Sequence, residues 1–209
     1  SSEPSPTVVG SSEEVSLLPI DDIVEVTDVW LLEPQPGVID WGLVVVRDPA
    51  SVDESPVDVD ITVELLAADD AVVELVRRVL RLSDDEPAAV AGRLTVRSSL
   101  ADTPERLRFD LAHATAPEAQ ISEADVSSLP DVVSLLRLGD EVVATLRGAD
   151  TAADDLSALL VWRDVDGDVD AVVPVDVASI EPDEVVQVAV DLDGEVVPDG
   201  RADALLWLR

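Results

Sequence analysis

Short Val- and Leu-rich runs, separated by Asp, Gly and Pro, recur along most of this chain and limit the folds that are open to it. β-Branched side chains such as Val favour the pleated, half-buried surface of a sheet. Such runs, recurring at short intervals with turn residues between them, are typical of sandwiches and barrels. The pattern predicts an all-β fold with strands at residues 24–32, 38–47, 57–66, 71–82, 88–97, 106–112, 132–138, 141–147, 156–163, 169–180, 185–192 and 204–208.

One of these runs, residues 71–82, fits an amphipathic helix almost as well as a strand. An internal repeat decides between the two. Residues 61–73 and 158–173 each hold an apolar run, an acidic turn and a second apolar run. An acid–proline step follows each of them, at Pro87 and at Pro182, and then a Val-rich run. The second copy has Pro174 in the ambiguous segment, which a helix interior resists, so we predict a strand in both copies.

The repeat predicts two tandem β-sandwich domains, at residues 15–112 and 128–209. Residues 113–127 are predicted to link them, because they are rich in Ala, Ser, Pro and Glu and lack strand periodicity; a short helix at residues 119–126 is an alternative. Residues 1–14, rich in Ser, Pro and Glu, are predicted to be a flexible leader or arm.

The order of strand, acidic turn, strand, proline step and strand resembles the FxLYD-type domain of exported bacterial proteins, which are often lipoproteins. Asp166-Gly167-Asp168 stands where that family has its hairpin, and residues 181–184 stand where it has a loop. The first copy departs from the pattern, since Asp69-Asp70 has no Gly, and the Phe and Tyr of the family name are absent. The resemblance implies tandem immunoglobulin-like sandwiches in an exported protein, and it transfers no functional residue.

The charge of the chain is strongly one-sided. Asp and Glu number 46 against 13 basic residues, which gives a formal net charge of −33. Such self-repulsion opposes compaction unless salt screens it, yet a chain that is 47% hydrophobic is no disordered acidic tail. We interpret the acidity as adaptation to high salt or to an exposed surface; a nucleic-acid mimic and a cation-binding protein are the alternatives.

The composition also excludes several classes of protein. Scattered Arg residues among so many acids offer no basic footprint, so we predict no binding of nucleic acid. No apolar run is long enough for a transmembrane helix. The absence of Cys excludes disulfides and thiolate metal sites.

The sharpest local pattern places carboxylates at every second residue, in Asp164, Asp166, Asp168 and Asp170. Oxygen-rich loops of this kind can hold Ca²⁺, which takes six to eight hard ligands, although the EF-hand spacing is not met. Asp-Gly is also a strong two-residue hairpin signal. Two interpretations stay open, a hairpin with an acidic outer face and a weak Ca²⁺ site. Residues 191–195 repeat the pattern and are predicted to form a hairpin.

No catalytic residue can be assigned. His113 is the single histidine and is predicted to lie at the surface or between domains; no nucleophile-elbow sequence accompanies it. The aromatic residues are Trp30, Trp41, Trp162, Trp207 and Phe109. They lie within Val- and Leu-rich runs, which predicts that they belong to the core; a binding face made of Trp is the alternative. We predict no enzyme activity and no cofactor apart from the Ca²⁺ alternative.

These expectations favour a non-catalytic, salt-adapted module at the cell surface or outside the cell, with a protein or cell-envelope partner. The alternative is a structural subunit of an extracellular filament or virion that self-associates through its N-terminal arm. In that case residues 7–9 would pair as a strand with a neighbouring subunit's sheet edge.

Overall fold

The computed structural model describes residues 20–48, 57–82, 87–96, 103–114, 129–149, 156–192, 195, 197–200 and 202–208. Within these ranges the chain forms one short 3-10 helix and twelve strands, so the protein is all-β, as predicted. The elements are η1 (Ile20–Asp22), β1 (Val24–Gln35), β2 (Val38–Arg47), β3 (Val57–Leu66), β4 (Val72–Leu82), β5 (Ala88–Thr95), β6 (Arg106–His113), β7 (Asp131–Leu138), β8 (Glu141–Arg147), β9 (Leu156–Arg163), β10 (Val169–Val177), β11 (Val185–Asp191) and β12 (Ala204–Leu208).

Every predicted run forms a strand, and the ambiguous residues 71–82 form β4. Two strands differ from their predicted bounds by three residues: β10 ends at Val177, and β1 continues to Gln35 because a tight hairpin follows it directly. Gly37 supplies the positive φ of 78° that this turn requires, and its N–H donates to the Glu33 carboxylate at 2.9 Å.

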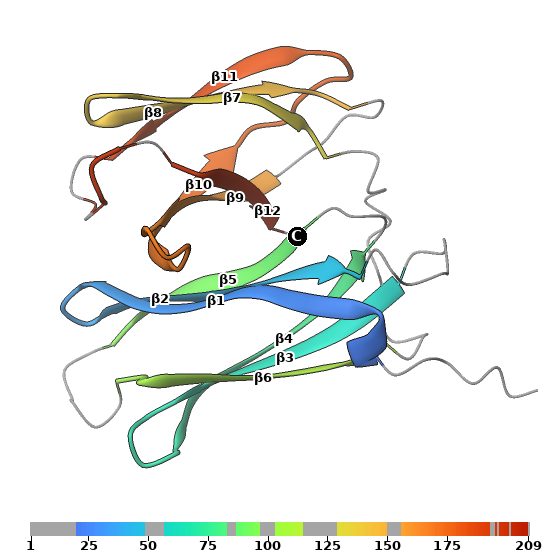
Figure 1. Ribbon diagram of the computed structural model, residues 1–209, viewed down its shortest axis with the longest axis vertical. Coiled ribbons are helices and arrows are strands. Elements are labelled where there is room, and N and C mark those ends of the chain that lie inside the picture. Colours follow the sequence, from blue (N-terminus) through green and yellow to red (C-terminus); the bar gives the residue numbers. More distant parts are fainter. Residues whose placement is uncertain are drawn as a thin grey trace, which may run out of the picture.

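The strands form four three-stranded layers (Figure 1). Along the long axis of the molecule they are β11-β8-β7, β10-β9-β12, β1-β2-β5 and β4-β3-β6. Pairing within each layer is antiparallel. One parallel bridge, between Leu208 and Ala89, joins β12 to β5, so the two inner layers share an edge.

Strands β7 to β12 pair in the same order as β1 to β6. In the first set, β1, β2 and β5 form one layer and β3, β4 and β6 the other; in the second set, β7, β8 and β11 form one layer and β9, β10 and β12 the other. We call β1 to β6 the first half of the molecule and β7 to β12 the second half.

Each half encloses a core between its two layers. In the first half the central side chains include Leu43, Ile61 and Leu65, all fully buried. In the second half they include Leu160 and Trp162. The alternating pattern of β3, with Val59, Ile61, Val63 and Leu65 on one face and Asp58, Asp60, Thr62 and Glu64 on the other, explains why that layer has one buried and one outer face.

A third cluster lies between the two inner layers and joins the halves. It contains Trp30, Val44, Ala89, Leu159, Val161, Val172 and Leu206. Strands β2 and β9 are buried on both faces, because successive residues such as Leu159, Leu160 and Val161 contribute alternately to this cluster and to a core. The halves are therefore packed face to face through apolar side chains rather than linked by the chain alone.

The segments between and before the strands give different outcomes for their predictions. The predicted hairpin at residues 191–195 is wrong, since β11 pairs with β8 whereas β12 pairs with β9 in a different layer. The predicted leader (residues 1–14) and the short helix at residues 119–126 lie outside the described residues, as does most of the predicted linker. In the part of the chain that the structure describes, no helix has the length and apolarity needed to cross a membrane.

Candidate functional site

A cleft of about 510 Å³ lies in the first half of the molecule. It lies where β1, at the edge of one layer, faces β6, at the edge of the other. Three consecutive residues of each strand line it, Val24, Glu25 and Val26 from β1 and Phe109, Asp110 and Leu111 from β6, together with Asp48. The cleft is thus a gap between two sheet edges.

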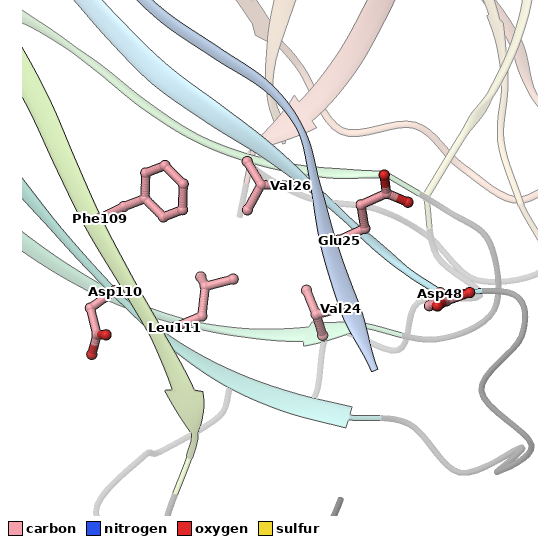
Figure 2. A pocket seen from close by; sticks show the side chains of 7 residues that line it. All are labelled: Val24, Glu25, Val26, Asp48, Phe109, Asp110 and Leu111. Carbon is pink, nitrogen blue, oxygen red and sulfur yellow. The ribbon is translucent and has the colours of Figure 1, made fainter. Parts of the chain in front are cut away.

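Figure 2 shows how the lining side chains are directed. Phe109 and Leu111 point from β6 toward β1, and Val26 and Val24 point back toward them. The carboxylates of Glu25, Asp48 and Asp110 lie outside this apolar space and form an acidic rim. Four apolar side chains thus face one another across the cleft, and three carboxylates line it beside them.

Local features close both ends of the cleft along β1. At one end, Ile20 of η1 is buried in the core of the first half, and η1 contacts both β1 and β6. At the other end, the register between β1 and β2 shifts between Val26 and Asp28, which is a bulge at Thr27. Bulges at sheet edges bend the strand and interrupt pairing. The bulge thus follows directly after Val26, the last residue of β1 that lines the cleft.

The prediction that the aromatic residues belong to the core is confirmed for the four Trp residues, none of which is more than 7% exposed. It is wrong for Phe109, which is 38% exposed. Phe109 alternates with Leu107 and Leu111 on the inner face of β6, but among the described residues no strand lies beside the outer edge of β6. The sequence holds no signal for this exposure, because it depends on which strands end their sheets.

Of the acidic residues predicted as a hairpin or a weak Ca²⁺ site, three connect β9 to β10 (Asp164, Asp166 and Asp168), and Asp170 lies at the start of β10. A hairpin forms there, with Gly167 at a φ of 93°. One carboxylate oxygen of Asp164, Oδ1, accepts the N–H groups of Asp166 at 2.9 Å and of Asp168 at 3.0 Å. Asp164 thus stabilises the turn itself, and the other three carboxylates are exposed. The Ca²⁺ assignment stays a prediction.

The described residues bring together no group of three or more His, Asp or Glu side chains that could hold a metal ion. His113 is half-buried at the end of β6.

A second, small cavity of about 50 Å³ lies between the halves, beside Trp30 and Trp41. There Arg93 donates to the buried Asp40 carboxylate at 2.6 and 2.9 Å, and this ion pair raises the pKa of Arg93.

Opposite charges are paired on the outer face of the β4-β3-β6 layer. Cross-strand ion pairs join Arg81 to Asp58, Arg77 to Asp60 and Arg108 to Glu64. The hydrogen bond from Arg77 is the main cause of the lowered pKa of Asp60. This face therefore holds a large share of the few basic residues in the chain.

The outer face of the β11-β8-β7 layer is different. Ala189, Val143 and Leu136 lie side by side across its three strands, and Gln187, Thr145 and Ser134 form the neighbouring row. Leu136 is 53% exposed. The two ends of the four-layer stack thus differ: one is an ion-paired face, and the other has uncharged central rows with Glu141, Asp191 and Arg147 at their ends.

Comparison with known proteins gives no assignment for this geometry. No protein-family model matches the chain, and no curated protein matches it either.

Proposed function

We propose that this protein is a non-catalytic module exposed at the cell surface, adapted to high salt and built from two immunoglobulin-like sandwich domains of the FxLYD type. The observation that carries the proposal is the buried apolar packing of the first half against the second half. Because the halves share an apolar interface, we expect them to behave as one stiff body, as a spacer or display module requires.

Two further features support this proposal. The pairing order of β1 to β6 recurs in β7 to β12, which is expected of two tandem copies of one domain. The net charge of −33 suits a protein that stays soluble and separate in concentrated salt. The partner is a protein or another component of the cell envelope.

Protease treatment of intact cells tests the location. A surface module is digested on intact cells suspended in their normal salt, whereas a cytoplasmic control protein survives. Lysine-directed labels are unsuitable because the chain has no Lys. Digestion only after the cells are lysed would contradict the proposal.

A second candidate, a structural subunit of an extracellular filament or virion, is favoured by one observation. The cleft between β1 and β6 leaves two sheet edges side by side without a strand between them among the described residues. Unpaired edges are templates for a strand from another chain.

A further inference from the structure

We propose that the cleft between β1 and β6 accepts residues 7–9 of a second copy of this chain as an added strand. This inference rests on the second candidate function and names its partner. Its first support is the chemistry of the cleft. An added strand would find the backbone edges of β1 and β6 on its two sides and the side chains of Val24, Val26, Phe109 and Leu111 around it. Backbone hydrogen bonds give such strand addition its affinity, and pockets for alternate side chains give it specificity.

In the second half, the strand edge that corresponds to the outer edge of β6 is paired with another strand. Strand β12 holds the place in the second half that β6 holds in the first. Its far edge, away from β9, pairs with β5 of the other half through Leu208 and Ala89. The corresponding edge of β6, away from β3, has no strand neighbour within the described part of the chain. One half of the molecule thus already pairs this edge with a strand from outside its own sandwich.

The amino-terminal sequence fits the cleft in charge and in length. Residues 5–12 (SPTVVGSS) contain no charged side chain, so the acidic rim of Glu25, Asp48 and Asp110 does not repel them. In an extended strand Thr7 and Val9 point to the same side, which provides two small side chains for the apolar space. Three residues extend over roughly 10 Å, and three residues of β1 line the cleft.

The chain before Ile20 is long enough for a second copy to donate the strand. Ile20 is packed at the end of the cleft, and residues 10–19 separate it from residues 7–9. Ten residues reach up to about 35 Å when extended. This length is sufficient to reach a neighbouring molecule. Because the donor segment and the acceptor cleft are different surfaces, the contact is heterologous and repeats from copy to copy, in an open filament or a closed ring.

Engineered cysteines test the proposal cleanly, since the chain has no Cys of its own. Full-length chains with Val9→Cys are mixed with full-length chains with Val26→Cys under oxidising conditions. We expect disulfide-linked heterodimers, and a ladder of larger species from chains that carry both substitutions. Leu75→Cys, on the far face of β4 and 59% exposed, replaces Val26→Cys in the control mixture.

Two results would overturn the inference. The first is heterodimer formation no greater than in the Leu75→Cys control. The second is a doubly substituted chain that closes only into a monomeric disulfide, because the chain's own segment would then occupy the cleft. Adding Phe109→Asp to the Val26→Cys chain should abolish the heterodimer while the circular dichroism spectrum stays that of a β protein. Neither negative result affects protease accessibility on intact cells, so failure of this inference is distinguishable from failure of the surface assignment.

Discussion

At the scale of single residues, two Trp–Gly pairs position the sheets of the first half. Trp30 of β1 lies opposite Gly42 of β2, and Trp41 of β2 lies opposite Gly92 of β5. In both pairs the indole covers the glycine, since a Cβ on Gly42 would lie 2.2 Å from Trp30 Cζ2 and one on Gly92 would lie 2.7 Å from Trp41 Cζ2. The two rings point in opposite directions, Trp30 into the contact between halves and Trp41 into the first core.

Replacing Gly42 with Ala should therefore destabilise the protein. The added methyl group displaces the Trp30 indole from a packed interface, and overpacking of this kind typically costs about 1–3 kcal/mol. Urea unfolding in molar salt measures the loss. Adding Trp30→Leu to Gly42→Ala should recover part of it, because the smaller side chain leaves room for the methyl group. A Gly42→Ala protein as stable as the original would show that the indole is not confined.

The Asp60–Arg77 pair makes a pH-dependent contribution. The hydrogen bond from Arg77 holds the pKa of Asp60 below its ordinary value of 3.8. A carboxyl with a lowered folded-state pKa contributes stability that is complete above its unfolded pKa and is lost as the pH falls through the folded value. The difference in unfolding free energy between the original protein and Asp60→Asn should be constant near neutral pH and shrink below about pH 4.

Urea unfolding over a pH series in molar salt measures this difference. The comparison between variants matters because protonation of the surplus carboxylates also relieves repulsion throughout the molecule. In an Arg77→Gln background the effect of Asp60→Asn should no longer depend on pH. An unchanged pH dependence in that background would assign the effect to another group.

At the scale of elements, the interface between halves depends on strands that are buried on both faces. The uninterrupted apolar runs in β2 and β9 are the sequence signal for such strands, in contrast to the alternation in β3. At the edge of this interface Arg163 of β9 bonds Asp28 of β1, with Nη2 and Oδ2 3.1 Å apart. This bond raises the pKa of Arg163, and both side chains are mostly buried.

A double-mutant cycle with Asp28→Asn and Arg163→Met should therefore show coupling between the halves. Each single substitution leaves a partly buried polar partner, at a cost of about 1–3 kcal/mol. The coupling energy is expected within the range of roughly 0.5–3 kcal/mol seen for residues in contact. The exposed pair Glu64–Arg108 is the matched control and should couple more weakly. Additive effects at Asp28 and Arg163 would indicate that the pair contributes nothing to the interface.

The sequence predicts the strands well because the signal for each of them is local. The run at residues 38–47 and its turn need no knowledge of distant residues, and β2 has those bounds. Sheet order is not local. The exposure of Phe109 and the failed hairpin at residues 191–195 both depend on which strand lies beside which. The cleft between β1 and β6 follows from the same non-local order, and so a linear pattern could not reveal it.

At the scale of the whole molecule, the surplus of acidic residues sets the conditions for folding. The thirteen Arg residues are few, and several of them are held in ion pairs with Asp or Glu. The remaining carboxylates repel one another, and salt screens repulsion between exposed charges beyond a Debye length of about 10 Å at 0.1 M.

The melting temperature should accordingly rise strongly between low salt and molar NaCl. Differential scanning calorimetry at one protein concentration measures this rise. A matched series with sucrose in place of salt distinguishes screening from general stabilisation by excluded solutes. A melting temperature that does not change with NaCl would contradict adaptation to high salt.

The halves meet through layers that do not correspond to each other, since β1-β2-β5 of the first packs on β10-β9-β12 of the second. The layers left at the two ends therefore differ as well: one carries paired Arg and Asp or Glu, and the other carries Leu136, Val143 and Ala189. An object with two unlike ends has a direction. If the molecules are attached to a surface by the same end, all of them have the same orientation. Each then exposes the same end face to the surroundings.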